Sequence, residues 1–175
     1  MDVRVFVSGA PGTGKTTVAA ELARQLQVPM LSLDVIKEAL GDSLGLGDQR
    51  WSDHVGDAAA EALFRLAASF PSVVAEGWWR RERRERAMRE FAGWVEVFCR
   101  CDPEVAAQRM RARAADARHP IHRDVINPAI LDGVADVVAS TTALRVTGGS
   151  LVEVDTTAHR NESEAVAAIR AALGA

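Results

Sequence analysis

Hydrophobic and polar positions along the chain follow two periods. Short apolar runs rich in valine are separated by longer stretches in which apolar residues recur at helical spacing. The first pattern is typical of buried β-strands and the second of amphipathic α-helices. Their regular alternation predicts βαβ units with right-handed crossovers and a parallel sheet. The predicted strands are Val3–Ser8, Pro29–Leu33, Ser72–Ala75, Val95–Cys101 and Leu151–Asp155.

Helices are predicted between these strands and after the last of them. Together with a five-stranded parallel sheet they give a three-layer α/β sandwich. No internal repeat, low-complexity tract or linker interrupts the alternation, so residues 1–175 are expected to form a single domain. The predicted helices are Lys15–Gln27, Asp34–Leu40, Asp53–Ser69, Arg81–Phe91, Pro103–Arg113, Pro128–Ala139 and Ser163–Leu173.

Two longer breaks lie between the predicted elements. Residues 41–53, GDSLGLGDQRWSD, form the longest glycine-rich stretch, and residues 114–124, AADARHPIHRD, form the second. Long loops inside compact domains often carry function. We therefore expect both segments to be mobile loops and the second to act as a small lid.

The composition is that of a soluble globular protein. Hydrophobic residues make up 48% of the 175, which is enough to bury a core, and 21 basic against 24 acidic residues leave a net charge of −3. No global field would attract nucleic acid or an anionic membrane, so any basic surface must be local. The chain opens directly into VRVFVSG and contains no apolar run that could span a bilayer. A cytoplasmic location is expected.

The two cysteines are predicted to be structural. Cys99 and Cys101 are separated by one residue within an apolar run, which places both on the same face of a strand. Their spacing suits neither a zinc site nor a redox pair. We expect buried, reduced thiols, as is usual in a cytosolic protein.

The sequence SGAPGTGKTT at residues 8–17 contains a phosphate-binding motif. It satisfies the pattern G-x-x-x-x-G-K-[ST] between an apolar strand and a helix. Glycines let backbone N–H groups point at phosphate oxygens, and the following helix contributes the positive end of its dipole. Lys15 would reach the β- and γ-phosphates, and the Thr16 hydroxyl would bind Mg²⁺. The expected nucleotide-binding residues are Gly9, Ala10, Pro11, Gly12, Thr13, Gly14, Lys15, Thr16 and Thr17, with ATP and Mg²⁺ as cofactors.

A P-loop alone does not select a reaction. A GTPase would carry D-x-x-G after its third strand and N-K-x-D later; only Asp53–Gly56 matches the first motif, after a glycine-rich loop, and the second is absent. An AAA-type motor would need a helical lid domain and oligomer-facing arginines, for which 175 residues leave little room. A compact phosphotransferase is the remaining class.

Asp34 is the candidate general base. It follows the second predicted strand, which in a parallel sheet places it at the carboxyl edge beside the P-loop. A carboxylate there can take the proton from an attacking hydroxyl. The alternative is an N-cap of the next helix, since aspartate is a favoured cap. Lys37, one turn later, is expected to contact the acceptor or to be solvated.

The end of the third predicted strand supplies more acceptor-side candidates. Glu76 stands where P-loop enzymes hold an acid that binds Mg²⁺ directly or through water, with acceptor binding as the alternative. Adjacent side chains diverge in an extended segment, so one of Trp78 and Trp79 is expected in the core and the other on the wall of the acceptor pocket. The expected acceptor-side residues are Asp34, Lys37, Trp51, Glu76, Trp78, Trp79 and Arg80.

Arginines follow the fourth predicted strand. Arg109 and Arg113 are four residues apart and share a helix face, and Arg118 lies in the predicted lid. A guanidinium group can stack on a purine and can offset charge on a transferred phosphoryl group. A solvated basic helix is the alternative. A lid that closed over ATP would exclude water, and His119 and His122 lack the spacing of metal ligands.

These residues resemble the small P-loop kinases related to chloramphenicol phosphotransferase, zeta-toxin kinases and the polynucleotide 5′-kinase domain. The resemblance spans nearly the whole chain and includes the P-loop, Asp34, the pair Arg109 and Arg113, and VEVDTT at 152–157. It implies that Asp34 is the general base and that Arg109 lies by the adenine. The stretch AEGWWRR at 75–81 departs from the chloramphenicol enzyme, which carries acidic residues and small groups there, and implies a different acceptor. The resemblance also implies that the nucleotide is bordered by Asp155, Thr156 and Thr157.

The leading hypothesis is a kinase that transfers the γ-phosphate of Mg-ATP to a hydroxyl of a small molecule resembling an antibiotic, sugar or nucleoside. Two alternatives stay open: a nucleic-acid 5′-hydroxyl kinase, against which the acidic charge weighs, and a nucleotide-binding regulatory protein that acts through a partner. The acceptor, the oligomeric state and the choice of adenine over guanine also stay open. The expected catalytic residues are Lys15, Asp34, Arg113 and Arg118.

Overall fold

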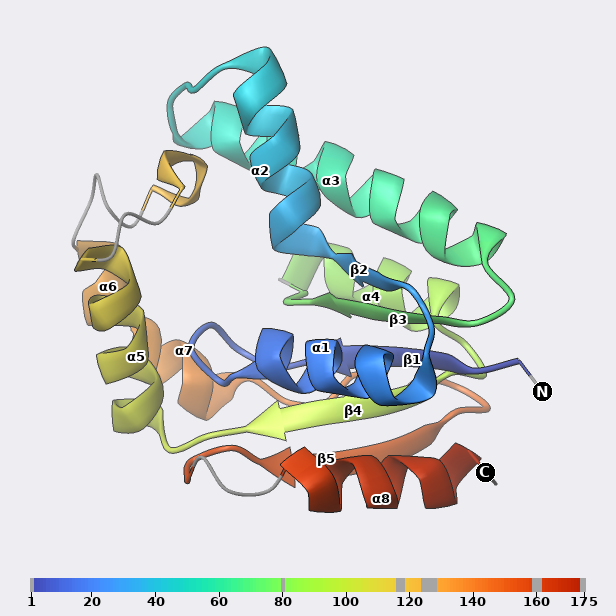
Figure 1. Cartoon of the computed structure of the whole chain (residues 1–175). Helices are drawn as coiled ribbons and strands as arrows, with labels where there is room; N and C mark the ends of the chain where they lie inside the picture. The colour runs from blue at the N-terminus through green and yellow to red at the C-terminus, as the bar shows by residue number, and fades with distance from the viewer. Residues whose placement is uncertain (1, 80, 116–118, 124–128, 159–161, 174–175) are drawn as a thin grey trace.

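The protein folds around a five-stranded, all-parallel β-sheet with helices on both faces (Figure 1). The computed structural model describes all residues except 1, 80, 116–118, 124–128, 159–161 and 174–175. This architecture confirms the predicted three-layer α/β sandwich. The strands, in the spatial order β2-β3-β1-β4-β5, are β1 (Arg4–Ser8), β2 (Met30–Ser32), β3 (Val73–Gly77), β4 (Val95–Arg100) and β5 (Ser150–Asp155).

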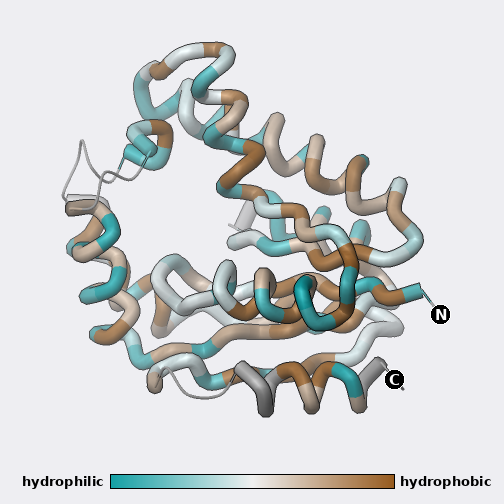
Figure 2. The backbone as a smooth tube through the Cα atoms, viewed as in Figure 1, coloured by the Kyte–Doolittle hydropathy of each residue, from teal (hydrophilic) through white to brown (hydrophobic). Residues whose placement is uncertain are grey.

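The two faces of the sheet are buried under different helices. Helices α1 (Lys15–Leu26) and α8 (Glu162–Leu173) cover one face, and α3 (Gln49–Ser69) and α4 (Arg81–Glu90) cover the other. Alternation along β1 serves both layers: Val5 and Val7 pack toward α1, whereas Phe6 stacks on Phe91 with ring centroids 4.6 Å apart. The central strands are mostly brown in Figure 2, as expected for a sheet buried on both faces.

Helices α2 and α3 form a hairpin where a loop was expected. Helix α2 (Leu33–Leu44) and α3 enclose only residues 45–48, so the prediction of a long loop at 41–53 is wrong. Gly45 ends α2 at a φ of 85°, and the Asp48 side chain caps α3 by accepting a bond from the Trp51 amide at 2.9 Å. Local capping thus converts most of the glycine-rich stretch into helix.

The second half of the chain completes the carboxyl edge of the sheet. Helix α5 (Pro103–Ala115) follows β4, and a short 3₁₀ helix, η1 (Pro120–His122), lies within the predicted lid. The helix predicted at 128–139 is interrupted at Gly133, which separates α6 (Ala129–Asp132) from α7 (Val134–Ser140); Pro128 lies outside the described residues. Among the described helices, none has both the length and the apolar character needed to span a bilayer.

The cysteines follow the predicted pattern in part. Both thiols are free; Cys99 is buried in the core, and burial raises its pKa to about 12. Cys101, one residue beyond β4, is only half-buried, and its sulfur lies 3.4 Å from the Arg109 guanidinium.

Candidate active site

The P-loop is held in shape by close contacts at its glycines. A Cβ atom at Gly12 would lie 2.4 Å from the carbonyl oxygen of Ala106, so only glycine lets the loop approach α5 this closely. Gly12 and Gly14 also adopt φ values of 80° and 73°, which disfavour other residues. Thr13 donates its hydroxyl to the Ala10 carbonyl at 2.8 Å, and both residues are buried. Ala10 and Thr13 therefore support the loop from beneath.

The N-terminus of α1 is open to a ligand. Gly14 is its N-cap residue and offers no side-chain cap to the first turn. The amides of that turn carry the positive end of the helix dipole, which favours an anion. Lys15 is buried at this turn, whereas Thr16 and Thr17 are exposed beside it. This arrangement is suited to phosphate groups.

A cavity of about 470 Å³ adjoins the P-loop. It is bounded by the P-loop and α1, by α5, and by the chain that follows β5. Most of the expected nucleotide-binding residues thus share one space. The cavity is lined by Gly12, Gly14, Lys15, Thr16, Thr17, Val18, Arg109, Ala112, Arg113, Val154, Asp155, Thr156 and Ala158.

Arg109 fastens α5 to the chain after β5. Its guanidinium donates to the carbonyl oxygens of Thr156 at 2.9 Å and Thr157 at 3.2 Å. The Thr156 hydroxyl lies 2.7 Å from the Thr13 carbonyl oxygen, which joins the same segment to the P-loop. The backbone amide of Thr157 lowers the pKa of Asp155 by donating to its carboxylate. These bonds fix the walls of the cavity around a half-buried guanidinium.

Four charged side chains converge at the carboxyl edge of the sheet. Glu76 is the penultimate residue of β3 and is 1% exposed, and burial raises its pKa. Lys15 and Arg113 act in the opposite direction, while Asp34 raises the pKa of Glu76 further. Side chains from α1, α2, β3 and α5 are therefore close enough to sense one another's charge.

Asp34 is not the cap of α2. Ser32 occupies the N-cap position, and its hydroxyl accepts a bond from the Val35 amide at 3.4 Å. The cap interpretation of Asp34 is therefore wrong, because the residue lies within the first turn. The Ser32 hydroxyl also donates to Glu76 Oε1 at 2.5 Å, which links the start of α2 to β3.

Glu76 and Thr16 are suited to Mg²⁺. The second oxygen of Glu76, Oε2, is buried and has no hydrogen-bond partner among the residues that the structure describes, which is costly for a carboxyl oxygen. A hard cation satisfies such an oxygen, and Mg²⁺ commonly takes one or two protein ligands besides water and phosphate. Within the described part of the chain, no cluster of three or more acidic, histidine or cysteine side chains forms a metal cage.

The expected acceptor-side residues do not all gather here. Trp79 lies in the core and stacks on Phe64 with centroids 5.2 Å apart, whereas Trp78 is half-buried. Trp51 lies in α3 and donates its indole N–H to Gly45 at 3.1 Å, so it braces the hairpin end. The helix rise of about 1.5 Å per residue places that end about 15 Å along α2 from Asp34. Arg80 and Arg118 lie outside the described residues.

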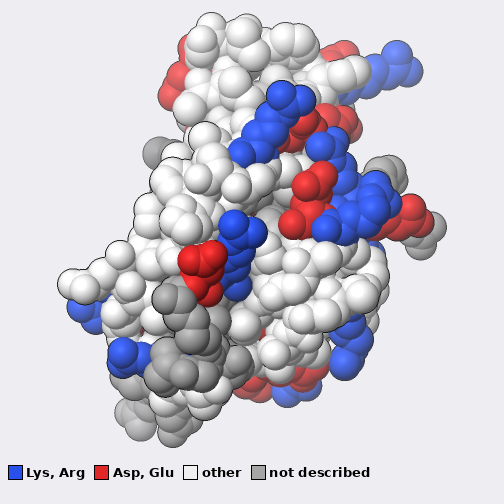
Figure 3. All heavy atoms as spheres, turned by 90° about the vertical axis from the view of Figure 1, so that its right-hand side faces the viewer, with Lys and Arg blue, Asp and Glu red and all other residues white. Residues whose placement is uncertain are grey.

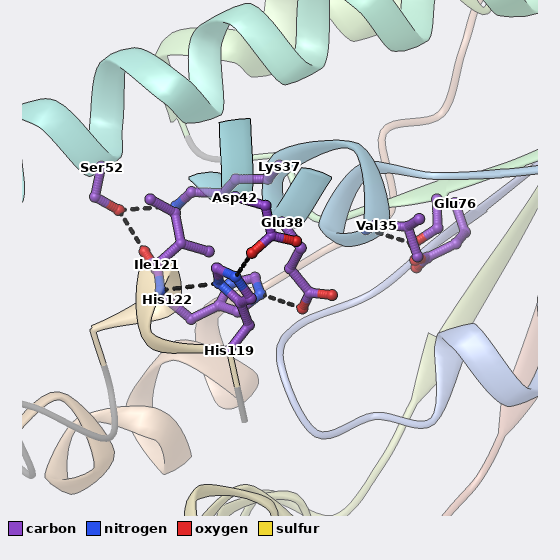
Figure 4. A network of polar contacts seen from close by, with 10 residues as sticks. Val35, Lys37, Glu38, Asp42, Ser52, Glu76, His119, Ile121 and His122 are labelled. Carbon is purple, nitrogen blue, oxygen red and sulfur yellow. Dashed lines mark hydrogen bonds and ion pairs between the residues drawn. The ribbon is translucent and has the colours of Figure 1, made fainter. Parts of the chain in front are cut away.

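A polar network on α2 is absent from the sequence prediction (Figure 4). Lys37 donates to Ser52 at 2.9 Å, and Glu38 pairs with His122 at 2.7 Å. The first contact joins α2 to α3, and the second ties the predicted lid region to α2. Glu38 lies four residues after Asp34 and therefore on the same face of the helix. This spacing is the sequence signal that could have pointed to Glu38 as part of the site.

The family comparison covers most of these elements. A family model described as an AAA domain, AAA_33, matches residues 5–130, from β1 through the P-loop, the α2–α3 hairpin and α5. The chain belongs to this AAA domain family. The family carries the AAA name, yet the relatives found for this chain are named as kinases.

Two curated relatives illustrate the range of kinases to which the chain is similar. The cytidylate kinase of Pyrobaculum arsenaticum is 29% identical over 128 residues, which cover 70% of this chain and 67% of that enzyme. The shikimate kinase of Bradyrhizobium diazoefficiens is 29% identical over 112 residues, or 63% of this chain and 54% of that enzyme. The matched part of the chain thus spans between about half and two thirds of these relatives.

Solved structures agree with the fold. The crystal structure of a candidate kinase from Chloroflexus aurantiacus is 31% identical, covers 98% of this chain and 99% of that one, and superposes with a TM-score of 0.83. A gluconokinase from Sinorhizobium meliloti 1021 shares the fold at 20% identity, with a TM-score of 0.63 and coverage of 99% and 95%. The chain therefore has the fold of a P-loop kinase. The narrower resemblance to chloramphenicol phosphotransferase and zeta-toxin kinases stays a prediction.

Proposed function

We propose that the protein is a kinase that transfers the γ-phosphoryl group of Mg-ATP to a hydroxyl group of a small molecule. The observation that carries this proposal is the convergence of Lys15, Asp34, Glu76 and Arg113 beside an uncapped helix N-terminus. Two cations, a candidate base and a candidate metal ligand are the parts that phosphoryl transfer requires. Kinases among the relatives support the same reaction class.

The acceptor is the finer part of the proposal. The names of the relatives point to two chemistries, because cytidylate offers a phosphate oxygen and shikimate offers hydroxyl groups. A phosphate acceptor needs cations and no base, whereas an alcohol needs a base. Asp34 supplies a candidate base at this edge, while Lys37 bonds to Ser52 and Arg83 bonds to Asp57 at 2.5 Å. An alcohol acceptor fits these described residues better than a phosphate.

Each residue then has a chemical role. Asp34 takes the proton of the acceptor hydroxyl while the hydroxyl oxygen forms a bond to the γ-phosphorus. The bond between the γ-phosphorus and the oxygen that leaves with ADP breaks in the same step. Lys15 and Arg113, with Arg118 as a further candidate, offset the charge that spreads over the transferred group. Bound Mg²⁺, held by Thr16 and Glu76, would neutralise phosphate charge. Arg109 contacts the adenine base of ATP, and residues 155–157 lie beside it. Trp78 and Lys37 remain candidates for acceptor contacts.

The test is ADP release from Mg-ATP, screened against alcohols, sugars, nucleosides, antibiotics and nucleoside monophosphates. Asp34→Asn should lower acceptor-dependent turnover by about 10²–10⁴-fold, the usual contribution of a general base. The affinity for mant-ADP should be unchanged, because a base is not a nucleotide ligand. Asp42→Asn is the matched control, since Asp42 is an exposed carboxylate on the same helix.

Two results would contradict the proposal. Loss of mant-ADP binding in Asp34→Asn would remove the residue from the acceptor side. Stimulation by nucleoside monophosphates alone, with Asp34→Asn fully active, would assign a phosphate acceptor instead.

A further inference from the structure

The segment 119–123, called here the latch segment, is docked on α2 through a buried contact. Ile121 is 1% exposed, and its side chain meets α2 at Gly41, where a Cβ atom would lie 3.2 Å from Ile121 Cγ1. Beside it, His122 Nε2 lies 2.7 Å from Glu38 Oε1, and only 7% of the His122 side chain is exposed. The Glu38 side chain is 34% exposed, so the bond is partly shielded from water and is worth more than a fully exposed ion pair.

Among the described residues, three further bonds join the latch segment to the hairpin, and in the exposed one His119 Nε2 lies 3.0 Å from Asp42 Oδ1. Ser52, buried on α3, donates its hydroxyl to the Ile121 carbonyl at 2.8 Å and accepts from Lys37. Arg123 donates to the Gly47 carbonyl at 2.6 Å. Figure 4 shows the side chains of α2, Ser52 of α3 and the latch segment meeting in one group. The segment therefore contacts α2, α3 and the turn between them.

The latch segment lies next to the candidate catalytic residue. Asp34 and Glu38 are one turn apart on α2, so the docked segment begins where the first turn ends. Exposure changes along the same helix: Val35 is 61% exposed, whereas Gly41 is buried beneath Ile121. The first turn of α2, with Asp34 and an uncovered apolar side chain, is thus bounded by the His122–Glu38 pair.

The P-loop cavity has separate walls. The described residues that line it come from the P-loop and α1, α5, and the chain around the end of β5. None of them belongs to α2, α3 or residues 119–123. A nucleotide can therefore enter this cavity without contact with the latch segment.

We propose that the latch segment gates the phosphate acceptor and not the nucleotide. It closes over an acceptor held against the first turn of α2 and must release Glu38 for the acceptor to enter, while ATP and ADP exchange beside α5. The sequence predicts a lid over ATP, whereas these contacts place residues 119–123 of that lid against α2 and α3, away from the described lining of the P-loop cavity. The acceptor half of the inference rests on the proposed kinase function.

Hydrogen–deuterium exchange of the free protein tests the docking without an acceptor. The amides of Ile121, His122 and Arg123 bond within the segment, to His119 and Pro120, and report whether it is ordered. His122→Ala should speed their exchange by about tenfold, the effect of losing a hydrogen bond to a charged group. His122→Gln, which keeps a donor near Nε2, should restore most of the protection. Asp42→Asn, at the exposed His119–Asp42 pair, should change little.

Nucleotide binding tests the assignment to the acceptor side. The Kd of mant-ADP should stay within about twofold of wild type in His122→Ala and Glu38→Gln, since a factor of two is less than 1 kcal/mol. Mg-ADP should leave the exchange of residues 119–123 unchanged. Protection of the segment by Mg-ADP, a tenfold loss of mant-ADP affinity, or unaltered exchange in a folded His122→Ala would each overturn the inference.

The acceptor itself provides the last measurement. With a hydroxyl compound found by the screen, His122→Ala should raise the acceptor KM by about tenfold and leave the ATP KM unchanged. A change in the ATP KM alone would overturn the gating role. Failure of the screen would instead count against the proposed function, because the exchange and mant-ADP results do not depend on it.

Discussion

The buried carboxyl group of Glu76 lowers the stability of the fold. A carboxyl group at 1% exposure is costly to bury when one oxygen finds no hydrogen bond in the described part of the chain, and Ser32 satisfies only the other oxygen. Lys15 and Arg113 offset part of that cost. The remainder is consistent with a site prepared for a cation that the folded chain alone does not supply.

Glu76→Gln should therefore stabilise the protein free of ligand and weaken its response to Mg²⁺. Burial raises the pKa of Glu76, so the folded state binds this proton more tightly than the unfolded state. The free energy of unfolding of the wild type should then fall as pH rises through that raised pKa, and the variant should lack this fall. At neutral pH its Tm should be about 2–4 °C higher, the shift produced by about 1 kcal/mol in a chain of this size.

Thermal denaturation across pH, with and without Mg-ADP, checks this prediction. Mg²⁺ should add to the stabilisation by ADP in the wild type and add little in Glu76→Gln. An equal Mg²⁺ effect in both proteins would remove Glu76 from the metal site. A lower Tm in the variant would mean that the carboxylate is stabilising.

At the scale of elements, the parallel strands and the P-loop were predictable because their signals are local. Apolar runs, glycine spacing and the residues at strand ends all lie within short stretches of sequence. The helical hairpin was missed because glycine at 41 is typical of a loop, whereas in α2 it leaves room for the Ile121 side chain. Ser32 was missed as the cap of α2 because Asp34 is an equally good cap by type.

Arg109 joins α5 to the end of β5. A substitution that tests these hydrogen bonds must keep the positive charge at residue 109. Arg109→Lys keeps the charge but cannot donate to Thr156 and Thr157 in the same fork geometry. The ATP KM should rise by about tenfold, the effect of losing about 1.5 kcal/mol of charge-assisted bonding, with kcat changed less. Steady-state kinetics and the Kd of mant-ADP measure this. Arg111→Lys, on an exposed part of the same helix, is the control.

At the scale of the whole molecule, the contacts of the latch segment could not be read from the sequence. His122 and Glu38 are 84 residues apart, and no periodicity links a short 3₁₀ turn to a distant helix face. The pair becomes visible only when the sheet order brings α2 and the chain beyond α5 to one edge. The order of strands and helices along the sequence therefore predicted the three-layer sandwich. The contacts of the latch segment depend instead on how elements far apart in sequence meet.

The net charge and the face opposite the candidate site do not favour a nucleic-acid acceptor. On the face at the amino ends of the strands, Lys and Arg atoms lie beside Asp and Glu atoms and form no broad basic surface (Figure 3). Arg83 and Arg86 pair with Asp57 and Glu61 within the α3–α4 layer. The net charge of −3 adds no long-range attraction for a polyanion.

A fluorescein-labelled oligonucleotide with a free 5′-hydroxyl should therefore not bind. Non-specific binding gains its free energy from counterion release, so each phosphate contact would steepen the fall of affinity with salt. Fluorescence anisotropy at about 50 and 200 mM salt should show no saturation at either, because a net charge of −3 does not attract a polyanion. Binding at low salt with a steep salt dependence, together with labelled phosphate transfer to the 5′ end, would identify a polynucleotide kinase. Transfer to small alcohols and none to the oligonucleotide would support a small-molecule acceptor and remove the polynucleotide alternative.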